Sequence, residues 1–324
     1  MPHRLAARLI GLIVCVGAMW TSACAGPPQS QPAATALDRH VVIISVDGLR
    51  PDMALRVEMP TLRGLMKRGC FTFWAQTVPV AITLPSHTSM LTGVGVATHG
   101  VDWNGDTPAG VYPYSRVPTL FEVARKAGFT TAMAAGKSKF VAVAKPGTLN
   151  WSFIPDAAKT TNNAVADQAV AMIHAHTPGV LFVHFPDVDT AGHAFGWGSP
   201  EQVKAIENAD GQIHRVLEAV EQEHLTDKTL VIVTADHGGA GLNHGPGDPR
   251  SRHIPWIAAG PDVRENFDLT LLDKLTVHTE DTFATACWFL SIPLPAGVEG
   301  NPVKEISQPR PAGEAKRVEP AVKN

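Results

Sequence analysis

Residues 230–239 read Leu230-Val231-Ile232-Val233-Thr234-Ala235-Asp236-His237-Gly238-Gly239. The apolar run 230–233 is typical of a buried strand. An Asp-His pair therefore follows a strand end and enters a glycine-rich loop, with His244 further along the same loop. A carboxylate and imidazoles in this arrangement suit a divalent cation such as zinc. An isolated Asp-His-Gly loop is more often a solvated turn, so the metal interpretation depends on the other strand ends.

Two further expected strands end in comparable groups. The β-branched run 40–46 precedes Asp47. The apolar run 180–185 is followed by Asp189 and His193, which lie four residues apart across an expected Gly-containing turn. Asp187 is two residues from Asp189 and competes for its role. Open α/β sheets bind ligands at the carboxyl ends of their strands, so we expect these side chains to converge.

A hydroxyl group and an amide extend this set. Pro85 suits the first turn of a helix, which places Thr83 at or just before a helix N-terminus, where free amides and the dipole favour an anion. Taken alone, Thr83 is most simply a helix cap, but beside a metal its hydroxyl is a candidate nucleophile. Asn104, in the loop 98–104, offers an amide donor.

Lys137 and Lys139 follow another expected strand, 130–134. They either clamp a phosphoryl oxygen or face solvent. Strands alternate with helices along the chain, which predicts one large, mostly parallel α/β sheet with helices on both faces. The longer expected helices are 118–128, 162–176, 199–223 and 279–290.

The first 25 residues have the pattern of a secretory signal. Arg4 and Arg8 precede an apolar run that ends at Trp20 and is followed by small residues; the run is too short for a stable transmembrane anchor. Cleavage after Ala25 fits this pattern, and lipid attachment at Cys24 is the alternative, the one predicted route to membrane anchoring. We expect an exported protein, periplasmic or envelope-associated.

The rest of the chain is expected to comprise a linker at 26–38, a catalytic domain at 39–302 and a flexible tail at 303–324.

The chain has 27 Lys and Arg against 30 Asp and Glu, a net charge of −3, which provides no electrostatic basis for binding a nucleic-acid duplex. Cys70 and Cys287 lie in apolar surroundings, so two buried thiols are favoured over one disulfide.

Five motifs together are highly specific. They are Val-Asp-Gly-Leu-Arg-Pro-Asp at 46–52, Thr-Leu-Pro-Ser-His-Thr-Ser-Met-Leu-Thr-Gly at 83–93, His-Gly-Val-Asp-Trp-Asn at 99–104, Asp-Thr-Ala-Gly-His at 189–193 and Thr-Ala-Asp-His-Gly-Gly at 234–239. The set resembles the alkaline phosphatase superfamily and, within it, the type I phosphodiesterase/nucleotide pyrophosphatase group. The resemblance runs from residue 41 to about 302 and implies an alkaline-phosphatase-like α/β/α sandwich.

The resemblance also implies two zinc ions per chain, although mixed nitrogen and oxygen ligands also suit manganese or iron. The ligands of one ion would be Asp47, Thr83, Asp236 and His237. The ligands of the other would be Asp189, His193 and His244. Thr83 would attack phosphorus to form a phosphothreonine that water then hydrolyses, and Asn104 would donate to an equatorial oxygen of the transition state.

Two features depart from nucleotide pyrophosphatases. Their third histidine usually follows a long insertion, whereas His244 comes at once; it is preferred to His253 because its sequence context matches the family. The missing insertion weakens the case for a nucleotide-base pocket. Lys137 and Lys139 are similar to the lysines of the phosphomonoesterase branch and of phosphonoacetate hydrolase. A sulfatase is disfavoured because Thr83 stands where sulfatases need a modifiable Cys or Ser.

We therefore expect a two-zinc hydrolase of small phosphate esters, of the phosphodiester or pyrophosphate type. An alkaline phosphomonoesterase or phosphonate hydrolase that uses Lys137 and Lys139 is the alternative. A third hypothesis is a non-catalytic module that binds a phosphorylated ligand without cleaving it.

Overall fold

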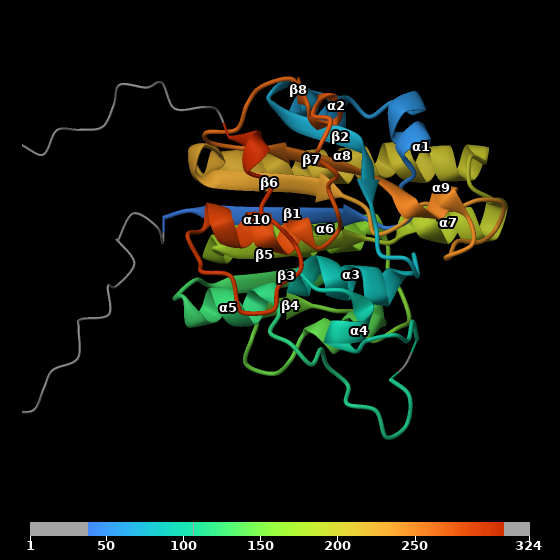
Figure 1. Ribbon diagram of the computed structural model, residues 1–324. Helices are drawn as coiled ribbons and strands as arrows, with labels where there is room; N and C mark the ends of the chain where they lie inside the picture. Colours follow the sequence, from blue (N-terminus) through green and yellow to red (C-terminus); the bar gives the residue numbers. More distant parts are fainter. Residues whose placement is uncertain (1–37, 106, 308–324) are drawn as a thin grey trace, which may run out of the picture. The chain divides into compact units, whose positions relative to one another are not determined.

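Eight strands form one sheet in the order β4-β3-β5-β1-β6-β7-β2-β8 (Figure 1). The computed structural model describes residues 38–105 and 107–307. The predicted signal at 1–25, the linker apart from Asp38, and the tail beyond Ser307 lie outside these residues. The strands are β1 His40–Val46, β2 Gly69–Gln76, β3 Thr131–Ala135, β4 Trp151–Phe153, β5 Val180–Phe185, β6 Thr229–Thr234, β7 His253–Ala259 and β8 Phe267–Asp268.

The five strands from β4 to β6 run parallel, which confirms the predicted fold class. β7 is antiparallel to both of its neighbours, β6 and β2. Every residue of the central strand β1 is buried, as its uninterrupted β-branched run predicts for a strand covered on both faces. The parallel strands therefore bring their carboxyl ends to one edge of the sheet, at the right of Figure 1.

Helices cover both faces of the sheet. They are α1 Pro51–Arg56, α2 Pro60–Lys67, α3 Thr83–Thr92, α4 Val96–His99, α5 Leu120–Lys126, α6 Asn162–His176, α7 Asp187–Phe195, α8 Pro200–Gln222, α9 Pro249–Arg252 and α10 Asp281–Phe289. Four 3-10 turns are also formed: η1 Ser138–Val143, η2 Thr226–Lys228, η3 Leu269–Leu271 and η4 Lys304–Ile306. In Figure 1, α3, α5 and α10 lie on one face, and α6 and α8 on the other.

Local sequence explains where the best-predicted helices begin. The Thr161 hydroxyl accepts the backbone N–H of Ala164 at the start of α6. The Ser199 hydroxyl accepts that of Gln202 at the start of α8, where Pro200 occupies the first helical position. Such caps satisfy amides that have no partner inside the helix, so both helices begin where the sequence indicates.

Two segments differ from expectation. Residues 187–195 form helix α7 instead of a tight turn, with Asp187 and Asp189 in the first turn, where the helix dipole favours carboxylates. The packed fold also continues beyond residue 302, because the Val303 and Ile306 side chains are buried. The folded domain therefore extends at least to Ser307.

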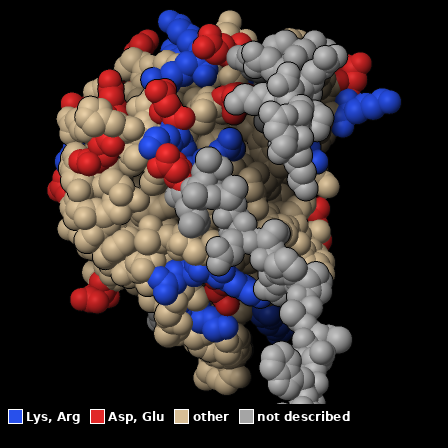
Figure 2. All heavy atoms as spheres, turned by 90° about the vertical axis from the view of Figure 1, so that its left-hand side faces the viewer, with Lys and Arg blue, Asp and Glu red and all other residues tan. Residues whose placement is uncertain are grey.

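Cys70 and Cys287 are both buried and free, and burial raises their pKa values to about 11 and about 12. Among the described residues, no helix is long and apolar enough to span a membrane. The face at the left of Figure 1, where β1 begins, carries acidic and basic side chains interspersed (Figure 2). This mixed surface contrasts with the buried charges at the opposite edge.

Candidate metal centre and active site

The carboxyl ends of the parallel strands bring together side chains from distant parts of the chain. Asp47 directly follows β1, Asp236 lies two residues after β6, and Asp189 stands in the first turn of α7, just after β5. Thr83 is the first residue of α3, a helix whose ten residues are all buried. The N-cap of α3 is Ile82, so Thr83 is not a simple capping residue.

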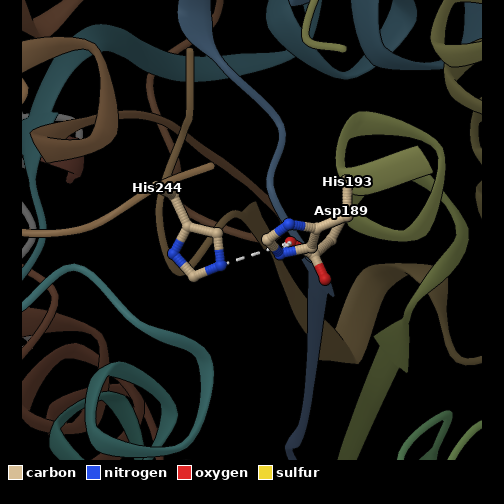
Figure 3. A group of neighbouring side chains, drawn as sticks. All are labelled: Asp189, His193 and His244. Atoms are coloured by element: carbon tan, nitrogen blue, oxygen red, sulfur yellow. Dashed lines mark ion pairs between the residues drawn. The ribbon is translucent and has the colours of Figure 1, made fainter. Parts of the chain in front are cut away.

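Asp189, His193 and His244 form one cluster, in which the carboxylate and the two imidazoles face one another (Figure 3). The Nε2 atoms of His193 and His244 lie 3.3 Å and 3.6 Å from Asp189 Oδ1. Their Nδ1 atoms lie 2.8 Å and 2.9 Å from the carbonyl oxygens of Leu242 and Ala81. Since a carbonyl only accepts, Nδ1 carries the proton in the neutral form of each ring, and Nε2 then presents a lone pair. We refer to these three residues as the outer cluster.

Asp47, Thr83, Asp236 and His237 form the inner cluster. His237 Nε2 lies 3.2 Å from Asp236 Oδ2, 3.4 Å from Asp47 Oδ1 and 3.4 Å from the Thr83 hydroxyl. All four residues are buried. His237 Nδ1 donates to the Gly238 carbonyl, which again leaves Nε2 as the free nitrogen.

The two clusters adjoin one another. The rings of His237 and His244 stack with their centroids 3.6 Å apart. Ligand atoms of Asp47, Asp189 and His237 also lie within 4.8 Å of one another, so Asp189 is close to both clusters. The seven predicted ligands thus lie together at the carboxyl ends of the parallel strands.

The surroundings of the carboxylate oxygens indicate whether these residues suit cations. Asp47 Oδ1, Asp189 Oδ1 and Asp236 Oδ2 are buried and have no hydrogen-bond partner. A buried carboxylate oxygen without a partner is strongly unfavourable, and each of these oxygens faces an imidazole nitrogen. Carboxylate oxygens together with unprotonated imidazoles are typical zinc ligands. The residues present therefore fit divalent metal ions.

Burial and neighbouring charges alter the pKa values of the carboxyl groups. Burial, together with the charge of Asp47, raises the pKa of Asp236 well above its usual range. Burial also acts to raise the pKa of Asp47, but the Lys137 ammonium and a hydrogen bond from His184 outweigh it and hold that pKa well below the usual range. A dication beside Asp236 would favour its ionised form.

The three imidazoles differ in their protonation. Burial lowers the pKa of His237 to about 4 and also lowers that of His244. The Asp189 carboxylate, which would stabilise a proton on the nearby Nε2 atom, instead raises the pKa of His193, whose side chain is 43% exposed. His237 and His244 are therefore neutral near pH 7, the form that binds metals.

Both predicted lysines and Asn104 lie beside Thr83. Lys137 Nζ is 2.6 Å from Oδ2 of both Asp47 and Asp189 and 3.5 Å from the Thr83 hydroxyl. Lys139 Nζ donates to Asn104 Oδ1 over 3.1 Å. That oxygen also accepts the backbone N–H of the residue after Thr83, so the NH2 group of Asn104 is the group left to donate to a substrate.

A groove of about 340 Å³ adjoins Lys139. Its apolar wall is formed by Val141, Ile154 and Pro155, and Asp156 lies among its polar lining. The groove therefore shares Lys139 with the predicted phosphoryl site.

Two buried histidines of the site were not predicted. His184 Nδ1 accepts the Gly136 N–H, so its Nε2 carries the proton and donates to Asp47 Oδ2 over 2.9 Å. His87 lies one turn after Thr83 and donates through Nδ1 to the Thr83 carbonyl, 2.8 Å away. The sequence signal for His184 is a polar side chain inside the apolar strand 180–185, which requires a buried partner.

The alternatives to Asp189 and His244 in the sequence, Asp187 and His253, lie outside the clusters. Asp187 accepts the backbone N–H of Asn162 at the start of α6. His253 stacks on Trp74, with ring centroids 4.1 Å apart. Asp189 and His244 are therefore the acid and the histidine that meet the other ligands.

Comparisons with known proteins identify a family to which the chain is similar. A family model described as type I phosphodiesterase/nucleotide pyrophosphatase matches residues 41–248. The chain is 23% identical over 256 residues to human ectonucleotide pyrophosphatase/phosphodiesterase family member 7, covering 73% of this chain and 55% of that protein. It covers 53% of the rat protein of the same name. The chain thus spans about half the length of these relatives.

Solved structures share the fold at low sequence identity. An inactive murine ectonucleotide pyrophosphatase/phosphodiesterase 5, with a threonine replaced by alanine and AMP bound, has a TM-score of 0.70 and 14% identity, covering 83% of this chain and all of that one. A phosphonate monoester hydrolase from Silicibacter pomeroyi has a TM-score of 0.63 and 17% identity, covering 85% of this chain and 78% of that one. The sheet and its helices are therefore those of alkaline-phosphatase-like proteins.

Proposed function

Because the chain belongs to the type I phosphodiesterase/nucleotide pyrophosphatase family of the alkaline phosphatase superfamily, we propose that it is a two-zinc hydrolase of small phosphate esters. The observation that carries this proposal is the Thr83 hydroxyl, which lies within 3.5 Å of both His237 Nε2 and Lys137 Nζ, beside two adjoining ligand clusters. The replaced threonine of the inactive murine relative supports an essential threonine.

The inner cluster would hold one zinc ion and the outer cluster the other. Two dications in such a site favour ionisation of a nucleophile and offset the charge of a transferring phosphoryl group. The unpartnered oxygens of Asp47, Asp189 and Asp236 are the groups that would accept them. Lys137 adds a third positive charge next to the reacting hydroxyl.

The residues of the chain then divide the reaction into two displacements. The Thr83 oxygen attacks phosphorus as the bond to the leaving alcohol breaks, and the alcohol departs with a proton. Water next attacks the phosphothreonine, the bond from phosphorus to the Thr83 oxygen breaks, and the hydroxyl is restored. Asn104 and Lys139 bind the non-bridging oxygens, on which negative charge is concentrated.

Phosphodiester or pyrophosphate cleavage is the first candidate activity, because the family and the matched human protein bear that name. Monoester or phosphonate cleavage is the second, supported by Lys137 and Lys139 in the pocket. A monoester dianion has one more negative charge than a diester, and two lysines offset that charge. The fold shared with a phosphonate monoester hydrolase is consistent with this second candidate.

Nitrophenyl phosphate and its methyl diester separate the two candidates. We expect a higher kcat/KM for the diester, measured on the zinc-loaded protein. A higher value for the monoester would reverse the order of the candidates. Stoichiometric zinc without turnover of any ester in a panel would instead support a phosphate-ligand binding module.

We further propose that the protein is exported, on the basis of the Arg-rich start and the apolar run before Ala25. Secretion followed by N-terminal sequencing tests this proposal. A mature N-terminus at Gly26 supports signal cleavage, and a lipid-modified N-terminus at Cys24 supports envelope anchoring. An unprocessed N-terminus starting at Met1 would contradict both forms of processing.

A further inference from the structure

We propose that Trp197 is a positioning residue that holds the imidazoles of the outer cluster in their metal-binding orientation. This inference rests on the proposed two-metal function. Trp197 lies two residues after the end of α7, the helix that carries Asp189 and His193. Its side chain is almost fully buried, with 8% of the residue exposed.

The indole contacts both imidazoles of the cluster. Its ring lies edge-on to His193, with centroids 5.3 Å apart and planes at 84°. It lies 5.9 Å from the His244 ring at 66°. The two imidazoles are themselves 4.9 Å apart. One side chain thus limits the rotation of both rings, in the geometry that aromatic pairs prefer.

The indole itself is fixed by its surroundings. Its Nε1–H donates to the Gly48 carbonyl over 2.9 Å, and the backbone N–H of Trp197 donates to the Gly241 carbonyl over 2.8 Å. A Cβ at Gly239 would lie 2.3 Å from the indole ring. The absence of a side chain at Gly239 therefore makes room for the tryptophan.

The outer cluster needs such support more than the inner one does. The His193 side chain is 43% exposed, so burial alone does not restrict its rotation. His237 in the inner cluster is fully buried. Carbonyl partners determine which nitrogen of His193 and His244 is free, while the indole restricts where those nitrogens point. Supporting contacts of this kind typically alter metal affinity about 10- to 100-fold.

A zinc titration in competition with a chelator tests the proposal on the full-length protein. For Trp197→Leu, we expect one of two zinc equivalents to weaken by about 10-fold or more, while the other keeps its wild-type affinity. Trp197→Phe keeps an aromatic ring but loses the N–H donor, so a smaller loss at the same equivalent is expected. Trp74→Leu is the matched control, because Trp74 is 61% exposed and stacks on His253 outside the clusters.

Cobalt absorption spectra provide a second measurement, because they report the ligand geometry of each bound ion. The Trp197 variants should change the spectrum of one ion only. Wild-type affinities and spectra in both variants would overturn the proposal, as would equal weakening of both equivalents, which indicates general destabilisation. If Trp197→Leu does not fold by circular dichroism, Trp197→Phe decides alone. Absence of metal binding by the wild-type protein would instead overturn the proposed function.

Discussion

The inner and outer clusters contain similar ligand types but are constructed differently. The inner cluster is attached to the ends of two adjacent buried strands, β1 and β6, and to the first residue of the buried helix α3. The outer cluster joins helix α7 to the loop that follows His237. The His237 side chain is fully buried, whereas the His193 side chain is 43% exposed.

A sheet and a loop therefore restrict metal-ligating side chains in different ways. Strand register and burial hold the inner residues in place, as in the pairing of Ser45 with Thr234 just before the two carboxylates. The outer residues depend on individual side-chain contacts. We expect the inner cluster to release its ion slowly and the outer cluster to exchange its ion more readily with solvent.

The largest expected effect is at Thr83 in the inner cluster. Thr83→Ala removes the nucleophile and should lower kcat by a factor on the order of 10⁶, as for the loss of an essential nucleophile in other hydrolases. Both zinc equivalents should remain, because carboxylates and imidazoles still supply the ligands. Thr83→Ser is the control, since it keeps a hydroxyl. Substantial turnover by the alanine variant would show that another group attacks phosphorus.

Removing one ligand from each cluster tests whether the clusters bind separate ions. Asp236→Asn and His193→Ala should each weaken one zinc equivalent by more than about 100-fold, exceeding the effect of losing a supporting contact. The two variants should weaken different zinc equivalents, and Asp236→Asn should weaken the more tightly bound one. Asp187→Asn is the control, as this carboxylate faces Asn162. Loss of the same equivalent in both variants would mean one shared site.

Lys139 should matter more for monoesters than for diesters. Lys139→Met removes a charge that contacts Asn104 and is expected to lower monoester kcat/KM by about 100-fold, the scale for losing one transition-state donor. Diester turnover should fall less, since a diester has one charge fewer. Lys204→Met on the exposed face of α8 is the control. Equal losses on both substrates would contradict charge selection by Lys139.

The smallest expected effect is a release of protons on zinc binding. The pKa values of Asp236 and His193 are raised, so below those values each group carries a proton that zinc must displace. Zinc affinity should therefore increase with pH and become constant once the pH is above both raised pKa values. Calorimetric titrations in two buffers of different ionisation enthalpy count the protons released. The Asp236→Asn variant should release fewer protons than the wild-type protein. An unchanged number of protons would contradict the assignment of one of them to Asp236.

Much of the fold could be predicted because the signals are local. The β-branched run of β1, the capped helix α6 and the Ser-Pro start of α8 each determine their own boundaries. The motifs likewise indicated the seven clustered ligands, because these residues follow recognisable strand ends or, for Thr83, begin a helix. Their roles in binding metal and in catalysis remain predictions.

Other features depend on tertiary contacts that no local pattern reveals. Helix α7 contains Gly192, which reads as a turn residue, yet a Cβ there would lie 2.8 Å from the Trp197 ring. Strand β2 was not predicted; its pairing with β7 is interrupted by a register shift between Thr72 and Ala75. The hydrogen bonds from His184 to Asp47 and from Trp197 to Gly48 also join residues more than one hundred positions apart.

The reversal of β7 against β6 has an evolutionary consequence. The connection between these strands leaves the carboxyl edge of the parallel strands after Asp236 and returns to the same edge at His253. Additional residues inserted there would lie near the two clusters without shifting the pairing of either strand. A lineage can therefore acquire new specificity by lengthening this single connection while its reaction chemistry is inherited unchanged.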